Sequence, residues 1–267
     1  MILNDVSSAL EVAAQPSVVC VPCFSGTPWD LKALTGLDGF TTRSMRLPED
    51  IADVDEYADV FAEQVQGLDS YVLVGDSFGA VISLALAARQ PKGLAGLVLS
   101  GGFAANPLPR WKSVAAKLSR FANGALYRHG TLRFHAFQLA SHFDAAAEVP
   151  HTQNDYRRLF VQNTPRSSYT ARVTSVTQLN LLTVLALVRV PTLVLTPADD
   201  RLIGVKAARQ LLDGIPQSSE IVLPETGHMF RFTHPTLYSN TIRAFVDSLP
   251  LADMSSEAVA SSEAVAS

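Results

Sequence analysis

Cysteine and long apolar runs are scarce in this chain of 267 residues. Its two cysteines stand together as Cys20-Val21-Pro22-Cys23, a spacing that allows a redox-active disulfide when it opens a helix. Here Cys20 lies inside an apolar strand pattern, so we do not expect redox chemistry. Two cysteines alone are also too few ligands for a structural zinc ion.

Charged residues are scarce as well. Asp, Glu, Lys and Arg make up 17% of the chain, and the net charge of −4 at pH 7 gives no reason to expect a nucleic-acid partner. The longest apolar segment, at 179–188, is interrupted by Asn180 and Thr183 and is too short to span a bilayer. The sequence does not open with a basic segment followed by a long apolar stretch. We therefore expect a cytoplasmic protein with no membrane partner.

Motifs for binding nucleotide phosphates are also missing, because the sequence holds neither a G-x-G-x-x-G pattern nor a P-loop. No set of residues indicates a metal site, so we expect neither a metal ion nor a cofactor. The apolar content of 48% is that of a globular protein, and a chain of this length can bury a large core.

The most informative pattern is GDSFG at residues 75–79. An apolar run at 71–74 leads into it and a helical pattern at 78–89 leads out. A G-x-S-x-G between a strand and a helix is typical of the nucleophile elbow, a strained turn that lifts a serine hydroxyl above the sheet. The pattern therefore predicts Ser77 as a nucleophile, and the alternative is a serine that only caps the helix.

Two later loops carry the partners that a serine nucleophile needs. An apolar strand pattern at 190–196 is followed by Asp199 and Asp200, and another at 221–224 is followed by His228. Serine, carboxylate and histidine in this order, each after a strand, is the α/β-hydrolase order and differs from the orders in chymotrypsin and subtilisin. A lone Asp or His in a loop is usually a solvated polar group, but the three together favour a catalytic triad.

From about residue 16 to residue 249 the chain resembles α/β-hydrolase-fold serine esterases with an inserted helical lid. Within that superfamily it is most similar to the pimeloyl-[acyl-carrier protein] methyl ester esterase group. Aligned on the preceding strand, the resemblance places the acid of the triad at Asp200, and Asp199 is the alternative. His228 would then act as the base and Asp200 would hold its imidazole ring.

Strand and helix patterns alternate along the chain, which indicates an α/β fold with a mostly parallel sheet and helices on both faces. The predicted strands are 17–21, 41–46, 71–75, 96–100, 192–196 and 220–223, and the predicted helices are 53–66, 78–89, 205–212 and 235–248. Helical patterns alone fill 103–189, where the resemblance implies a lid. We expect a hydrolase core at 1–102 and 190–250, a lid at 103–189 and a disordered tail at 251–267, where SSEAVA is repeated.

The intermediate of ester hydrolysis needs two backbone N–H donors that face its oxyanion. Phe78, directly after the nucleophile, is the first expected donor. The second lies in the loop after the first strand, where the resemblance implies His-Gly-X and this sequence has Pro22-Cys23-Phe24. Phe24 would then be the donor, and the loss of both His and Gly is a departure from the family.

Aromatic residues near the motifs predict an apolar acyl pocket. The expected substrate-binding residues are Phe24, Trp29, Phe78 and Phe160, and further lid aromatics are Phe134, Phe137 and Phe143. Ordinary packing in the core or the lid is the alternative for each lid residue.

The predicted lid has eleven Lys and Arg residues but three Asp and Glu, a net charge of +8 against −12 in the rest of the chain. Such a surface attracts acidic partners over long distances, although basic residues on a solvated face are the alternative. In the esterase group, lid arginines dock an acidic acyl-carrier protein, and Arg157 and Arg158 lie in a similar segment here.

Together these observations predict a serine carboxylic-ester hydrolase that works through an acyl-enzyme. The expected substrate is a small-molecule ester with a medium acyl chain, and the resemblance points to a methyl ester carried by acyl-carrier protein. The alternatives are a thioesterase or a carbon–carbon bond hydrolase on the same triad, and a ligand receptor that turns over slowly.

Overall fold

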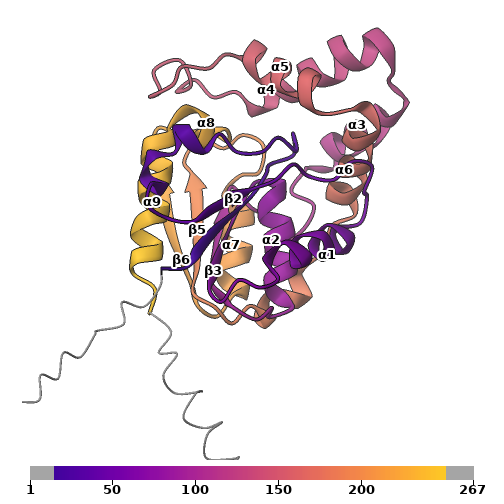
Figure 1. The fold of residues 1–267 in the computed structure, drawn as a ribbon. Helices are drawn as coiled ribbons and strands as arrows, with labels where there is room; N and C mark the ends of the chain where they lie inside the picture. The colour runs from indigo at the N-terminus through magenta and orange to yellow at the C-terminus, as the bar shows by residue number, and fades with distance from the viewer. Residues whose placement is uncertain (1–14, 251–267) are drawn as a thin grey trace, which may run out of the picture. The chain divides into compact units, whose positions relative to one another are not determined.

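The computed structural model describes residues 15–250, and Figure 1 shows their ribbon. Within these residues six strands form one sheet in the order β2-β1-β3-β4-β5-β6, and every neighbouring pair is parallel. The strands are β1 Ser17–Val21, β2 Thr42–Ser44, β3 Tyr71–Asp76, β4 Leu94–Ser100, β5 Thr192–Pro197 and β6 Ser218–Leu223. The predicted α/β class and its mostly parallel sheet are confirmed.

The central strands are apolar at almost every position because helices cover both faces of the sheet. In β3, Tyr71 and Leu73 join a core cluster on one face, and Val72 and Val74 join a cluster on the other. The first cluster includes residues of α1 Val54–Val65, α2 Phe78–Ala88 and α7 Val205–Gly214. The second includes residues of α9 Pro235–Asp247, which follows the short α8 Phe230–Thr233.

Four further α-helices lie between β4 and β5 along the chain, together with the short 3₁₀-helices Ser119–Phe121 and Leu182–Leu187 and a π-helical turn at Leu126–Thr131. The α-helices are α3 Arg110–Leu118, α4 Leu132–Leu139, α5 Gln153–Asn163 and α6 Arg166–Gln178. We call residues 103–189 the helical insertion. In Figure 1, α4 and α5 lie at the top, beyond the carboxyl ends of the strands. The action of this insertion as a lid stays a prediction.

The helical insertion and the sheet belong to one compact unit, Pro16–Leu249. The insertion has its own apolar cluster, built from residues such as Leu132, Tyr156 and Phe160, which Met229 of the sheet part joins. No helix among the described residues is both long enough and apolar enough to cross a membrane.

One predicted segment differs in the structure. The strand expected at 41–46 is limited to β2, because it lies at the edge of the sheet and pairs only with β1 over three positions. The tail predicted at 251–267 lies outside the described residues, so it stays a prediction.

Candidate active site

Ser77 occupies the sharp turn between β3 and α2. Its backbone has φ 56° and ψ −111°, a conformation that residues with a side chain rarely adopt. A Cβ atom at Gly75 would collide with the backbone of Ala80, and one at Gly79 would collide with the carbonyl of Val21. The two glycines therefore allow the strand, the helix and the first strand's loop to come close enough to hold the strained turn.

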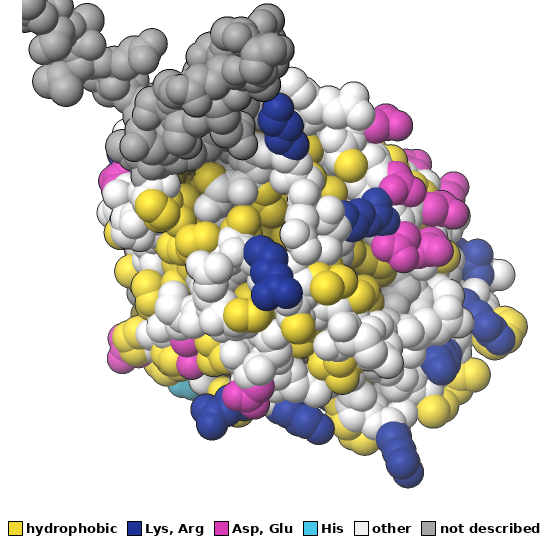
Figure 2. All heavy atoms as spheres, turned by 90° about the horizontal axis from the view of Figure 1, so that it is seen from below, with side chains coloured by type: hydrophobic (Ala, Val, Ile, Leu, Met, Phe, Trp, Pro, Cys, Tyr) yellow, Lys and Arg dark blue, Asp and Glu magenta, His cyan; other side chains and the backbone are white. Residues whose placement is uncertain are grey.

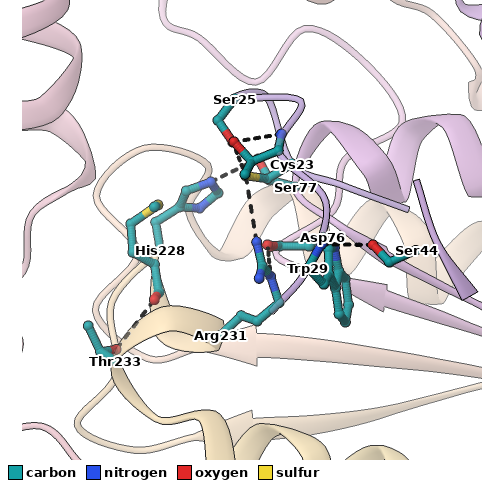
Figure 3. A network of polar contacts seen from close by, with 11 residues as sticks. Cys23, Ser25, Trp29, Ser44, Asp76, Ser77, His228, Arg231 and Thr233 are labelled. Carbon is teal, nitrogen blue, oxygen red and sulfur yellow. Dashed lines mark hydrogen bonds and ion pairs between the residues drawn. The ribbon is translucent and has the colours of Figure 1, made fainter. Parts of the chain in front are cut away.

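His228 lies in the loop after β6 and turns its ring toward Ser77, as Figure 3 shows. Its Nε2 atom is 2.9 Å from Ser77 Oγ, and its Nδ1 atom is 2.7 Å from Asp200 Oδ2. All three side chains are buried. The structure thus brings together the three residues that the sequence analysis assigned to the triad.

Asp200 is held by its own loop. Its second carboxylate oxygen, Oδ1, accepts hydrogen bonds from the backbone N–H groups of Leu202 and Ile203, both at 2.9 Å. Burial acts to raise the pKa of Asp200, but its charge interaction with His228 and these hydrogen bonds outweigh burial and keep the pKa below its ordinary value. The carboxylate is therefore ionised and fixed in orientation.

Asp199, the alternative acid, faces another set of partners. Its Oδ2 atom accepts a hydrogen bond of 2.6 Å from Ser141 Oγ, forms an ion pair with Arg201 at 3.4 Å and lies 3.2 Å from His142 Nδ1. These contacts tie the helical insertion to the loop after β5. Of the two neighbouring acids, it is Asp200 that contacts the imidazole of His228.

The pKa of His228 is raised above its ordinary value. Burial by itself would lower the pKa, but the charge and hydrogen bond of Asp200 outweigh burial, and the charge of Asp76 adds to them. The site therefore stabilises the imidazolium that forms when His228 accepts a proton.

A cavity of about 350 Å³ opens above Ser77 and His228. Its walls are mostly apolar and come from both the sheet part and the helical insertion. Apolar side chains in the lining include Phe24, Phe78, Phe103, Leu108, Leu126, Phe134, Leu139, Phe160, Val173, Val176, Leu202 and Met229. Three of the four residues predicted to bind substrate, Phe24, Phe78 and Phe160, are among them.

The prediction for the fourth residue, Trp29, is wrong. Trp29 is not among the described residues that line the cavity. Its side chain is 5% exposed and packs against Tyr238 at 5.6 Å between ring centroids, in the core cluster on the other face of the sheet. The backbone N–H of Trp29 donates to Ser44 Oγ, which turns this segment toward β2 and away from Ser77 (Figure 3).

The three further aromatic residues predicted for the pocket also differ in whether they line the cavity. Phe134 lies in the cavity wall, whereas the described lining includes neither Phe137 nor Phe143. The sequence analysis missed His135, whose ring lines the cavity and stacks on Phe160 with 4.6 Å between ring centroids. Burial lowers the pKa of His135 to about 3, so the ring is neutral. No local motif marks this histidine.

The loop that carries Phe24 is held by a residue that the sequence analysis counted with the basic lid surface. Arg172 is buried, and it donates hydrogen bonds to the backbone oxygens of Phe24 and Pro48 at 2.9 and 3.1 Å. Gly26, with φ +75°, leaves room for the guanidinium where a Cβ would touch it. Arg172 therefore supports this loop and is not part of a solvated face.

A buried ion pair lies below Ser77. Arg231 Nε is 2.7 Å from Asp76 Oδ2, and Arg231 also approaches Cys23 Sγ at 3.9 Å (Figure 3). Asp76 precedes Ser77 and Cys23 precedes Phe24. This pair therefore connects the nucleophile turn to the Phe24 loop and to the segment after His228.

A family model described as serine aminopeptidase, S33, matches residues 38–232. RutD of Klebsiella pneumoniae, a proposed carbamate hydrolase, is 26% identical over 182 residues, which is 68% of this chain and 67% of that protein.

Solved structures resemble the whole fold. An esterase from Exiguobacterium antarcticum matches with a TM-score of 0.74 and 15% identity, over 89% of this chain and 94% of its own. An enol-lactonase from Burkholderia xenovorans matches with a TM-score of 0.73 and 16% identity, over 88% and 92%. These likenesses show the α/β-hydrolase fold, and the family model covers more than half of the chain. The chain is therefore an α/β hydrolase that belongs to the serine aminopeptidase S33 family.

Proposed function

We propose that the protein is a serine ester hydrolase that works through an acyl-enzyme and takes esters with an apolar acyl chain of medium length. The observation that carries this proposal is the hydrogen-bonded Ser77–His228–Asp200 chain at the base of an apolar cavity of about 350 Å³. A cavity of this size and lining suits an acyl chain.

In the first step, Ser77 Oγ attacks the ester carbonyl carbon while His228 Nε2 takes the hydroxyl proton. The carbonyl oxygen becomes an oxyanion, which the backbone N–H groups of Phe24 and Phe78 would stabilise. Both residues line the cavity beside Ser77. Collapse of the intermediate breaks the bond to the leaving oxygen, which takes the proton from His228 and departs as an alcohol.

In the second step, a water molecule attacks the carbonyl carbon of the acyl-enzyme while His228 takes one of its protons. The bond between the acyl carbon and Ser77 Oγ then breaks, the proton returns to Ser77, and the carboxylic acid leaves. Asp200 keeps the Nδ1–H tautomer in both steps, so that Nε2 always faces the reacting oxygen.

The cavity favours an acyl ester over a peptide with a free amino end. An aminopeptidase must hold the ammonium group of its substrate, which requires a carboxylate in the cavity. Among the described residues that line the cavity, Asp76 is the one carboxylate, and Arg231 already neutralises it. His135 is neutral, so it adds no charge to the apolar wall.

Hydrolysis of p-nitrophenyl esters from acetate to dodecanoate tests the proposal. We expect the rate to peak at a medium chain length. A longer acyl chain makes more apolar contact until it fills the cavity, and chains beyond that length no longer fit. Ser77→Ala protein should give background rates at every chain length. Ser83→Ala, a buried serine of α2 outside the cavity lining, is the matched control and should keep the activity. Activity that survives in Ser77→Ala would remove Ser77 as the nucleophile.

A thioester and a carbon–carbon substrate with the same acyl group, and a carbamate with an apolar chain of the same length, separate the other reactions that this triad supports. Carbamate hydrolysis is included because of the similarity to RutD. The oxygen ester should have the highest kcat/KM. Tight binding of the acyl group without turnover of any of these compounds would favour the slow receptor instead.

The pH profile is a second test. His228 must be neutral to take a proton, and its pKa is raised above 6.5. We therefore expect kcat/KM to fall as the pH drops through that raised value, with the half-maximal point above about pH 6.5. The stability that His228 contributes to the fold depends on pH in the opposite direction. The contribution of His228 is fully present below its unfolded pKa and is lost as the pH rises through its folded pKa.

Initial rates and melting temperatures measured across the same pH range check both statements. An acid limb centred well below pH 6 would contradict the assignment of His228 as the base with a raised pKa.

A further inference from the structure

Helix α3 turns an apolar stripe toward solvent. Trp111, Val114 and Leu118 recur at the spacing of one helix face, and all three are exposed, Trp111 to 61%. Within α3 only Ser113 is buried. A helix normally packs such a stripe against a core, so an exposed stripe of this size indicates a surface that is covered by a partner.

The exposed apolar side chains continue beyond α3. Phe121 is 66% exposed, and three more residues follow in the next segments. We call this set the insertion surface; it consists of Trp111, Val114, Leu118, Phe121, Leu126, Phe134 and Phe137. These are seven large apolar side chains within one stretch of the chain.

Basic side chains accompany the insertion surface. Residues 103–143 contain six Lys and Arg and no Asp or Glu. None of the six forms an ion pair with any described residue. Lys112 lies over the ring of Trp111, and Arg120 lies over the ring of Phe121. Cations and large apolar groups are therefore side by side on this part of the protein.

The insertion surface borders the mouth of the cavity. Helix α3 contributes Lys112 and Ala115 to the lining, and the segments at 126–139 contribute Leu126 and Phe134, which are both exposed and in the wall. Figure 2 shows the face at the bottom of Figure 1, away from α4 and α5, with apolar side chains, single basic side chains and, at one side, a group of acidic side chains.

We propose that the insertion surface docks on an anionic lipid surface. A lipid interface accepts both kinds of side chain at once, because apolar and aromatic groups enter the boundary of the acyl chains while Lys and Arg meet the anionic headgroups. Trp, Phe and Leu together with Lys and Arg are typical of helices that lie in such an interface. An acidic carrier protein would neutralise the cations but would cover seven large apolar side chains less well.

This docking is peripheral and needs no spanning helix, and it replaces the expectation from the sequence that the protein has no membrane partner. It also gives the cavity a direct path from the lipid, because Leu126 and Phe134 belong to both the insertion surface and the cavity wall. The delivery of an acyl chain along this path rests on the proposed ester hydrolysis. Binding to lipid does not, so it is tested with Ser77→Ala protein, in which the two proposals can fail separately.

The two tryptophans provide the measurement. Trp29 is buried and Trp111 is exposed, so a change of fluorescence on docking reports on Trp111. We expect vesicles of phosphatidylcholine mixed with phosphatidylglycerol to shift the emission to shorter wavelength and to carry the protein down in sedimentation. Phosphatidylcholine alone should bind at least tenfold more weakly, and salt should weaken binding to the mixed vesicles.

A matched pair of variants identifies the surface. Lys117→Glu/Leu118→Ser changes an exposed basic residue and its exposed apolar neighbour on α3, outside the cavity lining. Lys206→Glu/Val205→Ser makes the same change on α7, where both residues are also exposed. The α3 variant should lose about tenfold or more in partition to mixed vesicles, and the α7 variant should bind like the parent protein. Both should hydrolyse a soluble short-chain ester normally.

No binding to mixed vesicles at low salt would overturn the proposal, as would equal losses in the two variants. Salt-sensitive binding to acidic acyl-carrier protein, lost in the α3 variant and without any vesicle binding, would overturn it in favour of the carrier protein expected from the sequence.

Discussion

Replacing Asp200 with Asn should lower kcat on the best ester by about 10⁴-fold, because it forces His228 into the wrong tautomer. Asp200 Oδ1 accepts two backbone N–H groups, from Leu202 and Ile203. In the variant only the amide oxygen can replace Oδ1, so the amide NH₂ group must face His228 Nδ1. That nitrogen then has to accept, Nε2 carries the proton, and Ser77 has no base.

Asp199→Asn is the matched control, because it makes the same chemical change one residue away. Asp199 contacts Ser141, His142 and Arg201 and does not contact the imidazole, so we expect kcat within about threefold of the parent. The measurement is kcat of both variants by steady-state kinetics, with circular dichroism to confirm that both are folded. Equal losses in the two variants, or a small loss in Asp200→Asn, would show that Asp200 does not orient His228.

The remaining activity of Asp200→Asn should also shift with pH. Without the carboxylate, burial dominates the environment of His228 and lowers its pKa. The acid limb of kcat/KM should therefore move to lower pH than in the parent protein. An unchanged acid limb would mean that another group sets it.

The meeting of Ser77, Asp200 and His228 could be predicted from the sequence because each one follows its own strand. The edge of a parallel sheet brings the carboxyl ends of its strands together, so residues far apart in the sequence meet there. The choice between Asp199 and Asp200 needed the family resemblance, since both follow the same strand. The direction of the backbone decides which of these two neighbours faces His228, and this direction cannot be predicted from the residue types.

Trp29, Arg172 and His135 show where such reasoning ends. Trp29 is close to Phe24 in the sequence, but its backbone bond to Ser44 turns it to the other face of the sheet. Arg172 has the charge of a surface residue, yet it bonds to Phe24, which is 148 residues away. Contacts over such distances depend on how the helical insertion packs, and no local pattern specifies that packing.

The ion pair between Asp76 and Arg231 was missed for the same reason, since its members are 155 residues apart. Both side chains are buried, and the guanidinium also lies between the rings of Trp29 and Phe232, at 4.6 and 4.0 Å from their centroids. Each charge compensates the other at a place where both side chains are closed to solvent. Loss of one partner would therefore leave the other as an unpaired charge in the core.

Arg231→Met should reduce the free energy of unfolding by about 3–5 kcal/mol, because it leaves the Asp76 carboxylate buried without its partner. Met keeps apolar contact with the rings of Trp29 and Phe232, so the loss reports on the charge more than on packing. The double variant Asp76→Asn/Arg231→Met should recover most of the stability, since it removes both charges. Urea unfolding with equal slopes in all variants is the measurement.

The exposed ion pair of Arg209 and Asp213 on α7 provides the comparison. Arg209→Met removes an arginine from an aspartate at the surface, where water solvates the remaining carboxylate, so we expect a change below about 1 kcal/mol. If Arg231→Met cost no more than Arg209→Met, the buried pair would not hold the three loops together. If the double variant were as unstable as Arg231→Met, the loss would come from packing. If Arg231→Met lowers the free energy of unfolding and the double variant restores it, the stability comes from the balance of charges directly beneath Ser77.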